Sequence, residues 1–208
     1  MEEPNLGRQL FSPSELGLNK AVALVSRINR FYGTRWEGVP ERFDEKTLYV
    51  DSFIRSPKSI PMPNIIITCT DSIASRRIVA ETFGQLSRRT TYDEDRVYYW
   101  LDLGNAQSTG QVILGSSAIS QPKSSIYKTV ATLPTASDVF SGWQGQDDGD
   151  SGPSCSMAEA ISRQDPYINS TLGQFAGRLL LQLFRESVIS VRGLYLNLDT
   201  LTVAPIPV

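Results

Sequence analysis

The sequence of 208 residues predicts an α/β fold in which helices flank a mixed β-sheet. Three observations point to this class. The apolar run 65–67 lies between a proline-rich segment and polar turn residues, which is typical of a strand buried on both faces, as in parallel sheets. Residues 73–86 follow with a helix-permissive composition. Residues 96–104 are rich in β-formers and predict a further buried strand.

The amino-terminal part of the chain predicts one helix, at residues 18–32. Its apolar residues recur at helical spacing, residues 12–15 before it are a turn and helix-start signal, and Gly33 ends it. Residues 35–43 are compatible with a short strand. Residues 44–62 suggest a short helix or strand and then a proline-rich connector.

The middle of the chain predicts a hairpin followed by a loop. Residues 110–115 form the next predicted strand, and the turn-like residues 105–109 indicate that it runs antiparallel to the strand at 96–104. Residues 116–154 lose periodicity, and 141–153 are especially poor in core-forming residues. We therefore expect a mobile loop near 116–154.

The carboxyl-terminal part predicts one long helix and two strands. Order resumes at 156–163, and a helix is expected at 166–185. Its apolar stripe predicts packing on the sheet or on a second subunit; the stripe consists of Ile168, Leu172, Phe175, Ala176, Leu179, Leu180 and Leu183. Residues 188–198 and 201–208 alternate as two joined strands do. We expect residues 1–208 to form a single domain.

The composition excludes several classes of mechanism. These 208 residues contain no histidine, which rules out Ser-His-Asp and Cys-His catalysis within them, and most zinc hydrolase sites. The two cysteines, Cys69 and Cys155, are too few for a four-cysteine zinc site and too far apart for a redox CxxC motif.

Charge and hydropathy restrict the partners. A net charge of −2 and a pI near 5.3 argue against a nucleic-acid partner, and the arginine pairs at 76–77 and 88–89 are interpreted as solvated helix surface. No segment approaches the ~20 apolar residues that a membrane span requires, and no signal-peptide pattern begins the sequence. We therefore expect a cytoplasmic protein without a membrane partner.

Asp71 is the first candidate for a functional residue. It stands where the predicted strand at 65–67 ends, and open α/β sheets bind ligands at that edge. A carboxylate there can hold a magnesium ion, and Arg8 and Lys20 can neutralise the phosphate oxygens that the ion bridges. Each residue also has a structural interpretation: Arg8 as a surface charge, Lys20 as a solvated helix residue, and Asp71 as the cap of the following helix.

Three segments of the chain resemble motifs of one enzyme superfamily. Residues 5–9 (N-L-G-R-Q) are similar to N-L-x-R-Q, residues 17–21 (G-L-N-K-A) to G-x-x-K-A, and residues 69–72 (C-T-D-S), with Arg76, to C-x-D-N/S. In this order they resemble ThiF-type and ubiquitin-activating enzymes, essentially from end to end. The segments 100–105 and 110–115 and the tail 197–208 more narrowly resemble the ThiF-family protein of the bacterial PRTRC cassette.

The resemblance implies a Rossmann-like fold and the adenylation of a protein carboxylate. ATP and magnesium would bind at the carboxyl edge of the sheet of a homodimer, and the partner would be a ubiquitin-like or sulfur-carrier protein. Arg8 and Lys20 would hold phosphates and stabilise the developing charge, and Asp71 would ligate magnesium. The positions that match the ATP site are Asn5, Arg8, Gln9, Lys20, Asp71 and Ser72.

The two cysteines are interpreted differently. Residues 153–156 (P-S-C-S) are similar to the P-x-C-S/T segment that carries the thioester cysteine of ubiquitin-activating enzymes, and a helix start would lower the pKa of Cys155 without a histidine. The alternative is that Cys155 is only a small residue at a helix start. Cys69 is interpreted as a packing residue inside a buried strand.

The resemblance also has a departure at its start. Enzymes of this type begin with a strand, a G-x-G-G-x-G turn, a helix and a second strand that ends in a ribose-binding aspartate. This chain begins just after that point, so we expect an N-terminally incomplete fold without the glycine loop that cradles phosphates. The alternative function is a non-catalytic interaction or scaffold protein that keeps the dimer and partner surfaces.

Overall fold

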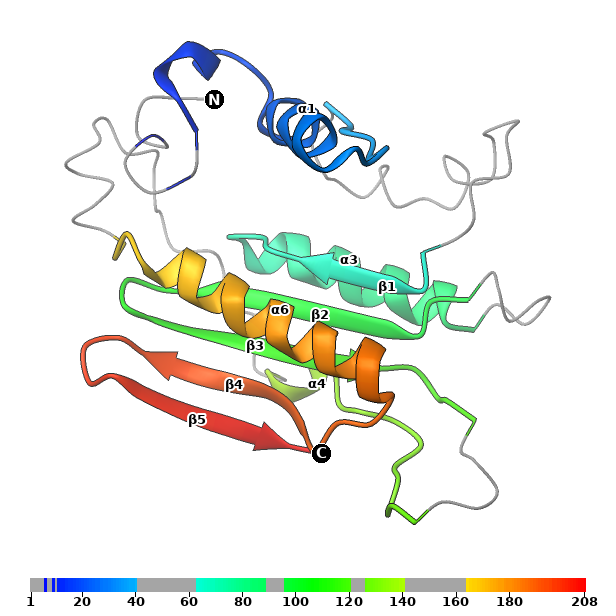
Figure 1. Ribbon diagram of the computed structural model, residues 1–208. Coiled ribbons are helices and arrows are strands. Elements are labelled where there is room, and N and C mark those ends of the chain that lie inside the picture. Colours follow the sequence, from blue (N-terminus) through cyan, green and yellow to red (C-terminus); the bar gives the residue numbers. More distant parts are fainter. Residues whose placement is uncertain are drawn as a thin grey trace, which may run out of the picture. The chain divides into compact units, whose positions relative to one another are not determined.

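The computed structural model describes residues 6, 9, 11–40, 63–88, 96–120, 126–140 and 164–208 (Figure 1). The chain divides into two compact units, Met1–Phe43 with Asp150–Tyr167 and Asp44–Gly149 with Ile168–Val208. Each unit is described by itself, and the single domain expected for residues 1–208 stays a prediction.

The first unit contains a short 3₁₀-helix, η2 (Pro13–Glu15), and the helix α1 (Lys20–Tyr32). The side chain of Asn19 caps α1 by accepting hydrogen bonds from the backbone N–H groups of Ala21 and Val22. Gly33 ends α1 in a left-handed conformation with φ of 67°, which glycine adopts without strain. The predicted helix is confirmed, and it starts two residues late because Asn19 is its cap.

Residues 33–40 follow α1 without forming a strand. The side chain of Asn29 binds this segment instead: its Oδ1 accepts from the Thr34 hydroxyl at 2.7 Å and from the Trp36 backbone N–H at 2.8 Å. The strand expected at 35–43 is therefore wrong for its described part.

The described residues of the second unit form a five-stranded sheet. In spatial order its strands are β1 (Ile65–Thr68), β2 (Tyr99–Asn105), β3 (Thr109–Ser116), β4 (Val191–Asn197) and β5 (Thr202–Pro207). β1 pairs in parallel with β2, and the other pairs are antiparallel. The mixed sheet, the hairpin and the two final strands are thus confirmed.

Helices cover both faces of this sheet. Figure 1 shows α6 (Ile168–Glu186) across one face, and α3 (Ile73–Leu86) and the short α4 (Ala136–Val139) on the other. The predictions at 73–86 and 166–185 are confirmed. None of the helices in the described ranges is long and apolar enough to cross a membrane.

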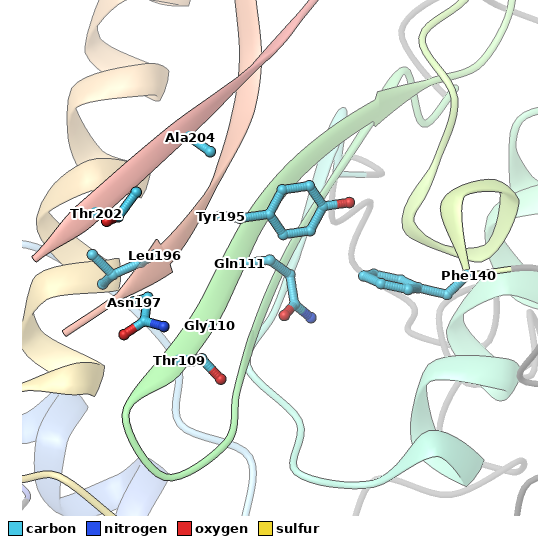
Figure 2. Close-up of a pocket in the computed structure, with 9 residues that line it drawn as sticks. All are labelled: Thr109, Gly110, Gln111, Phe140, Tyr195, Leu196, Asn197, Thr202 and Ala204. Atoms are coloured by element: carbon cyan, nitrogen blue, oxygen red, sulfur yellow. The ribbon is translucent and has the colours of Figure 1, made fainter. Parts of the chain in front are cut away.

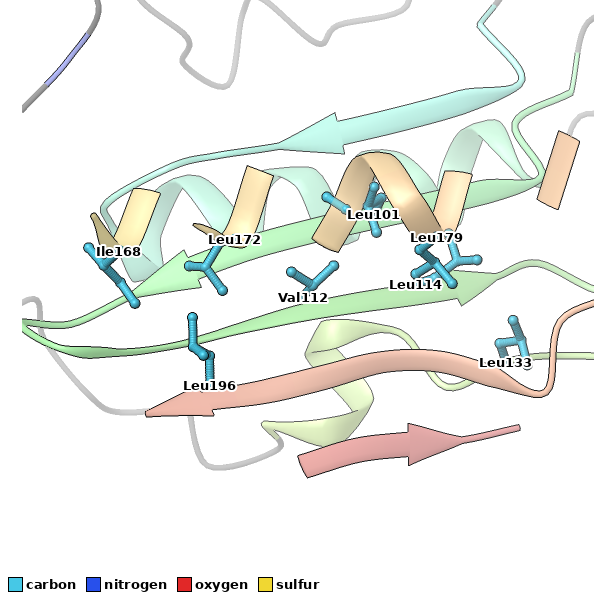
Figure 3. Close-up of a cluster of buried hydrophobic side chains, with 9 residues drawn as sticks. Leu101, Val112, Leu114, Leu133, Ile168, Leu172, Leu179 and Leu196 are labelled. Atoms are coloured by element: carbon cyan, nitrogen blue, oxygen red, sulfur yellow. The ribbon is translucent and has the colours of Figure 1, made fainter. Parts of the chain in front are cut away.

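The main core lies between α6 and the sheet, as Figure 3 shows. Its buried members are Leu101, Val112, Leu114, Leu133, Ile168, Leu172, Ala176, Leu179 and Leu196. On the other face Phe83 of α3 packs on Trp100 of β2, with ring centroids 6.0 Å apart. The apolar stripe of α6 therefore packs on the sheet, and burial of these side chains holds the second unit together.

β1 differs from its prediction in burial. It is an end strand of the described sheet, and Ile67 is 53% exposed, so β1 is not buried on both faces. Cys69 just after it is also exposed, and its interpretation as a packing residue is wrong. A continuous apolar run indicates a strand but does not say which neighbours will cover it.

β5 is the other end strand of the described sheet and contains Pro205 and Pro207. Beyond it, the backbone N–H of Val208 donates to the carbonyl oxygen of Ser190 at 3.1 Å.

The described part of the segment 116–154 folds back beside β3. Ser116 donates its backbone N–H to Leu133 O at 3.0 Å, and Ile119 donates to Ala131 O at 2.9 Å. α4 follows, and the mobility expected near 116–154 stays a prediction. The elements expected at 44–62 and 156–163 lie outside the described residues.

Candidate functional site

Asp71 lies between the end of β1 and the start of α3. The N-cap of α3 is Ser72, whose hydroxyl accepts from the backbone N–H of Ser75 at 3.1 Å and donates to the Ser75 hydroxyl at 2.7 Å. Ser72 rather than Asp71 therefore satisfies the helix start. The carboxylate of Asp71 is left exposed at the carboxyl end of the strand.

The surroundings of Asp71 fit a metal ion that takes one carboxylate from the protein and its other ligands from phosphate and water. Within the described ranges, no hydrogen bond or ion pair engages its carboxylate, and no group of three or more Cys, Asp or Glu side chains could hold a metal. Magnesium commonly binds through one or two carboxylates while phosphate and water complete its octahedron. Asp71 could supply such a single carboxylate.

Arg76 of α3 lies beneath the turn that carries Asp71. It is only 8% exposed, and its Nε lies 3.2 and 3.3 Å from the two carboxylate oxygens of Asp102. Its Nη2 donates to Thr70 O at 2.6 Å and to Leu103 O at 3.2 Å. The expectation of solvated surface is wrong for Arg76, whereas Arg77 and Arg88 are exposed as predicted.

Asp102 on β2 is completely buried and is held from two sides. Besides the ion pair with Arg76, it accepts from the Thr68 hydroxyl at 2.7 Å. The Thr68 oxygen in turn accepts from Trp100 Nε1 at 2.8 Å. Since a buried carboxylate is costly unless it is paired and hydrogen-bonded, this network lets the charge stay inside and ties β1, β2 and α3 together.

Gly104 on β2 provides the space for the Arg76 side chain. A Cβ at this position would lie 2.7 Å from Arg76 Nη2 and 2.3 Å from Gln111 Nε2. Both distances are shorter than van der Waals contact. Because Gly104 has no side chain, the ends of the Arg76 and Gln111 side chains can lie directly against the strand.

Cys69 is a poor nucleophile in this setting. Partial desolvation raises the pKa of its thiol although the residue is exposed, and the negative charge of Asp102 raises it further, against a smaller opposing effect of Arg76. The thiol is therefore protonated at neutral pH.

A groove of about 370 Å³ opens on the sheet face opposite α6 (Figure 2). It is lined by Thr109, Gly110, Gln111, Phe140, Tyr195, Leu196, Asn197, Thr202 and Ala204. Tyr195 and Gln111 are cross-strand neighbours and project toward Phe140, which follows α4. The side chains of Gln111 and Arg76 both lie over Gly104, so this end of the groove is next to Arg76.

The predicted site residues fall into three groups. Asp71 and Ser72 are adjacent in the second unit. Gln9, whose carbonyl accepts from the Phe11 N–H, and the exposed Lys20 at the start of α1 belong to the first unit, and the structure does not join the two pairs in one site. Asn5, Arg8 and Cys155 lie outside the described residues.

Sequence reasoning missed Asp102 and the groove. The signal for Asp102 was present: it is a single carboxylate inside a strand of aromatic and aliphatic residues, which requires a buried cation or donors. The groove had no comparable local signal, because its lining comes from three strands and the segment after α4.

Comparison with known proteins gives the family. The model of the ThiF family matches residues 1–204. A search of curated proteins found no match. The mixed sheet with flanking helices agrees with an α/β Rossmann-like ThiF fold, and the match covers nearly the whole sequence. The chain therefore belongs to the ThiF family.

Proposed function

We propose that this chain takes part in the ATP-dependent adenylation of the C-terminal carboxylate of a ubiquitin-like or sulfur-carrier protein. ThiF membership supports the reaction class. Asp71 is the observation that carries the proposal, because its carboxylate is exposed at the strand end while Ser72 caps the helix. Bound magnesium and ATP would supply an activated α-phosphate, from which the partner's carboxylate displaces pyrophosphate.

Individual residues have distinct proposed roles. Asp71 would be a protein ligand of magnesium. Arg8 and Lys20 would bind phosphate oxygens and stabilise the charge that develops during transfer. Asn5, Gln9 and Ser72 would complete the nucleotide site, as the family motifs imply.

The groove would receive the extended C-terminal segment of the partner. Its lining comes from β3, β4, β5 and Phe140, and Tyr195 and Phe140 offer apolar contact area with few rotamers to fix. Gln111 at its border and Arg76, which binds the carbonyl oxygen of Thr70 next to Asp71, both approach Gly104. Tyr195→Ala is expected to weaken partner binding by roughly 10-fold or more, as removal of a central aromatic contact does, without changing affinity for ATP.

ATP–pyrophosphate exchange tests the adenylation directly. The full chain is mixed with magnesium, ATP and small ubiquitin-like proteins that end in glycine, and exchange is expected only with a partner present. Asp71→Asn should lower the exchange rate by about 100-fold. Glu81→Gln, which changes an exposed carboxylate on α3, is the matched control and should exchange like the wild type.

Two outcomes count against the proposal. Unchanged exchange in Asp71→Asn would remove this residue from the site. The absence of both exchange and ATP binding in the wild-type chain would overturn adenylation as its activity.

A non-catalytic interaction protein is the second candidate, and the groove favours it too. Such a protein would bind its partner without ATP, and the complex would be unaffected by Asp71→Asn but weakened by Tyr195→Ala. Calorimetry with and without magnesium and ATP separates the two candidates, because adenylation also requires exchange.

We further propose a cytoplasmic homodimer and a thioester step at Cys155. Light scattering should give twice the 23.0 kDa of one chain; a monomer at working concentration would contradict this. Cys155→Ala should abolish a thioester adduct with the partner, which added thiols cleave, while sparing pyrophosphate exchange; an adduct that persists would remove Cys155 from the mechanism.

A further inference from the structure

We propose that Arg76 is a positioning residue: its guanidinium, oriented by Asp102, fixes the turn that carries Asp71 and so sets the place of the magnesium-binding carboxylate. The inference rests on the proposed function, in which Asp71 binds magnesium with ATP. It adds two buried residues, Arg76 and Asp102, that would act through Asp71 rather than as ligands of the nucleotide.

The direct link is the bond between Arg76 and the residue before Asp71. Nη2 lies 2.6 Å from the carbonyl oxygen of Thr70, and a charged donor makes such a bond short and strong. The same nitrogen contacts Leu103 O at 3.2 Å. One guanidinium therefore fastens the turn after β1 to the neighbouring strand β2.

Asp102 determines how the guanidinium is oriented. Both of its oxygens face Nε, which leaves Nη2 directed at the two carbonyl groups. The carboxylate is itself fixed by the hydroxyl of Thr68. The turn is thus held by a series of bonds that begins inside the sheet rather than at the surface.

The geometry requires the planar fork of arginine. Arg76 uses Nε for a carboxylate and Nη2 for two carbonyls, and it does so within the space that Gly104 leaves open. A lysine ammonium is a compact point charge without this fork, so it cannot keep the same set of bonds. A methyl group on Gly104 would displace Nη2.

The test measures metal binding rather than turnover. Water-proton relaxation enhancement reports how tightly the full chain binds Mn²⁺–ATP, with Mn²⁺ as the paramagnetic probe. Arg76→Lys and Asp102→Asn are expected to weaken this binding by about 10- to 100-fold, the effect typical of groups that orient a metal ligand. Arg192→Lys is the matched control. Arg192 is equally buried and donates to a carbonyl oxygen, that of Pro134, but it lies on β4, which β2 and β3 separate from β1.

A double variant distinguishes positioning from a direct role. If Arg76 acts through Asp71, Asp71→Asn combined with Arg76→Lys should bind Mn²⁺–ATP no more weakly than Asp71→Asn alone. Additive losses would mean that Arg76 acts independently of Asp71 and would overturn the inference. Should Arg76→Lys fail to fold, Gly104→Ala shifts the guanidinium without removing its charge and carries the same expectation.

The two proposals fail in different ways. If Asp71→Asn binds Mn²⁺–ATP like the wild type, the metal-binding role of Asp71 in the proposed function is wrong. If Asp71→Asn weakens binding while folded Arg76→Lys and Asp102→Asn both bind like the wild type, only the positioning role of Arg76 is wrong.

Discussion

The indole Nε1 of Trp100 lies 2.8 Å from the hydroxyl oxygen of Thr68, and both groups are buried. The hydroxyl also donates to Asp102 at 2.7 Å, so it serves a buried donor and a buried charge at once. Thr68→Val keeps the side-chain shape and removes both bonds. We expect a loss of about 1–3 kcal/mol in unfolding free energy, measured with urea, because polar groups are left unpaired.

Thr68→Ser is the control for this loss. It keeps the hydroxyl and removes one methyl group, which should cost about 1 kcal/mol or less. A Thr68→Val protein as stable as the wild type would show that the hydroxyl contributes nothing to the network.

Ser72 and Asp71 should differ in their effect on stability. Ser72→Ala removes the cap of α3 and is expected to lower the unfolding free energy by about 1 kcal/mol. Asp71→Asn should change it by less than about 0.5 kcal/mol, as is usual for surface positions. Urea unfolding of the two variants checks this, and the reverse order would identify Asp71 as the residue that stabilises the helix start.

Gly104 and Gly84 should respond in opposite ways to alanine. Gly104→Ala places a methyl group against Gln111 and Arg76 and should destabilise the protein by about 1–3 kcal/mol. Gly84 lies inside α3 with nothing within 4 Å of its added Cβ, so Gly84→Ala should stabilise by about 0.5–1 kcal/mol. Thermal unfolding compares them; equal stability of the two variants would contradict the close contact at Gly104.

The Cys69 thiol should become reactive only at a higher pH than an ordinary cysteine. Desolvation and the charge of Asp102 raise the pKa of its thiol, so the reactive thiolate appears only at a pH above that of an unperturbed cysteine. Alkylation by iodoacetamide, followed in Cys155→Ala, should show this midpoint. Asp102→Asn should move the midpoint to lower pH, since it removes a negative charge; a midpoint below that of an ordinary cysteine would contradict the raised pKa.

Local patterns were sufficient for most elements of the second unit. The bounds of α3 agree with the prediction at 73–86, and the turn at 105–109 identified the hairpin of β2 and β3, because capping and turn residues act over a few positions. The burial of β1 could not be predicted in this way. It depends on which strands and helices cover Ile67, and these lie far away in the sequence.

The sequence predicted the features of the site that depend on neighbouring residues, but not those that depend on contacts between distant residues. The place of Asp71 follows from the order of strand, turn and helix, yet either Asp71 or Ser72 could have capped α3, since both residue types do. Arg76 and Arg77 are neighbours with opposite exposure. Their difference arises from Asp102, 26 residues further along, and from the space over Gly104.

Pro205 and Pro207 affect how the outer edge of β5 could take part in the association of chains. The N–H of Val208 points inward to Ser190, so by strand alternation the nitrogens of the two prolines face away from β4. Proline has no N–H to donate, and a strand from another chain would find acceptors there without most of the donors it needs. The two prolines therefore disfavour extension of the sheet from one chain into the next at that edge, and copies of this protein that associate along β5 are expected to do so through side chains.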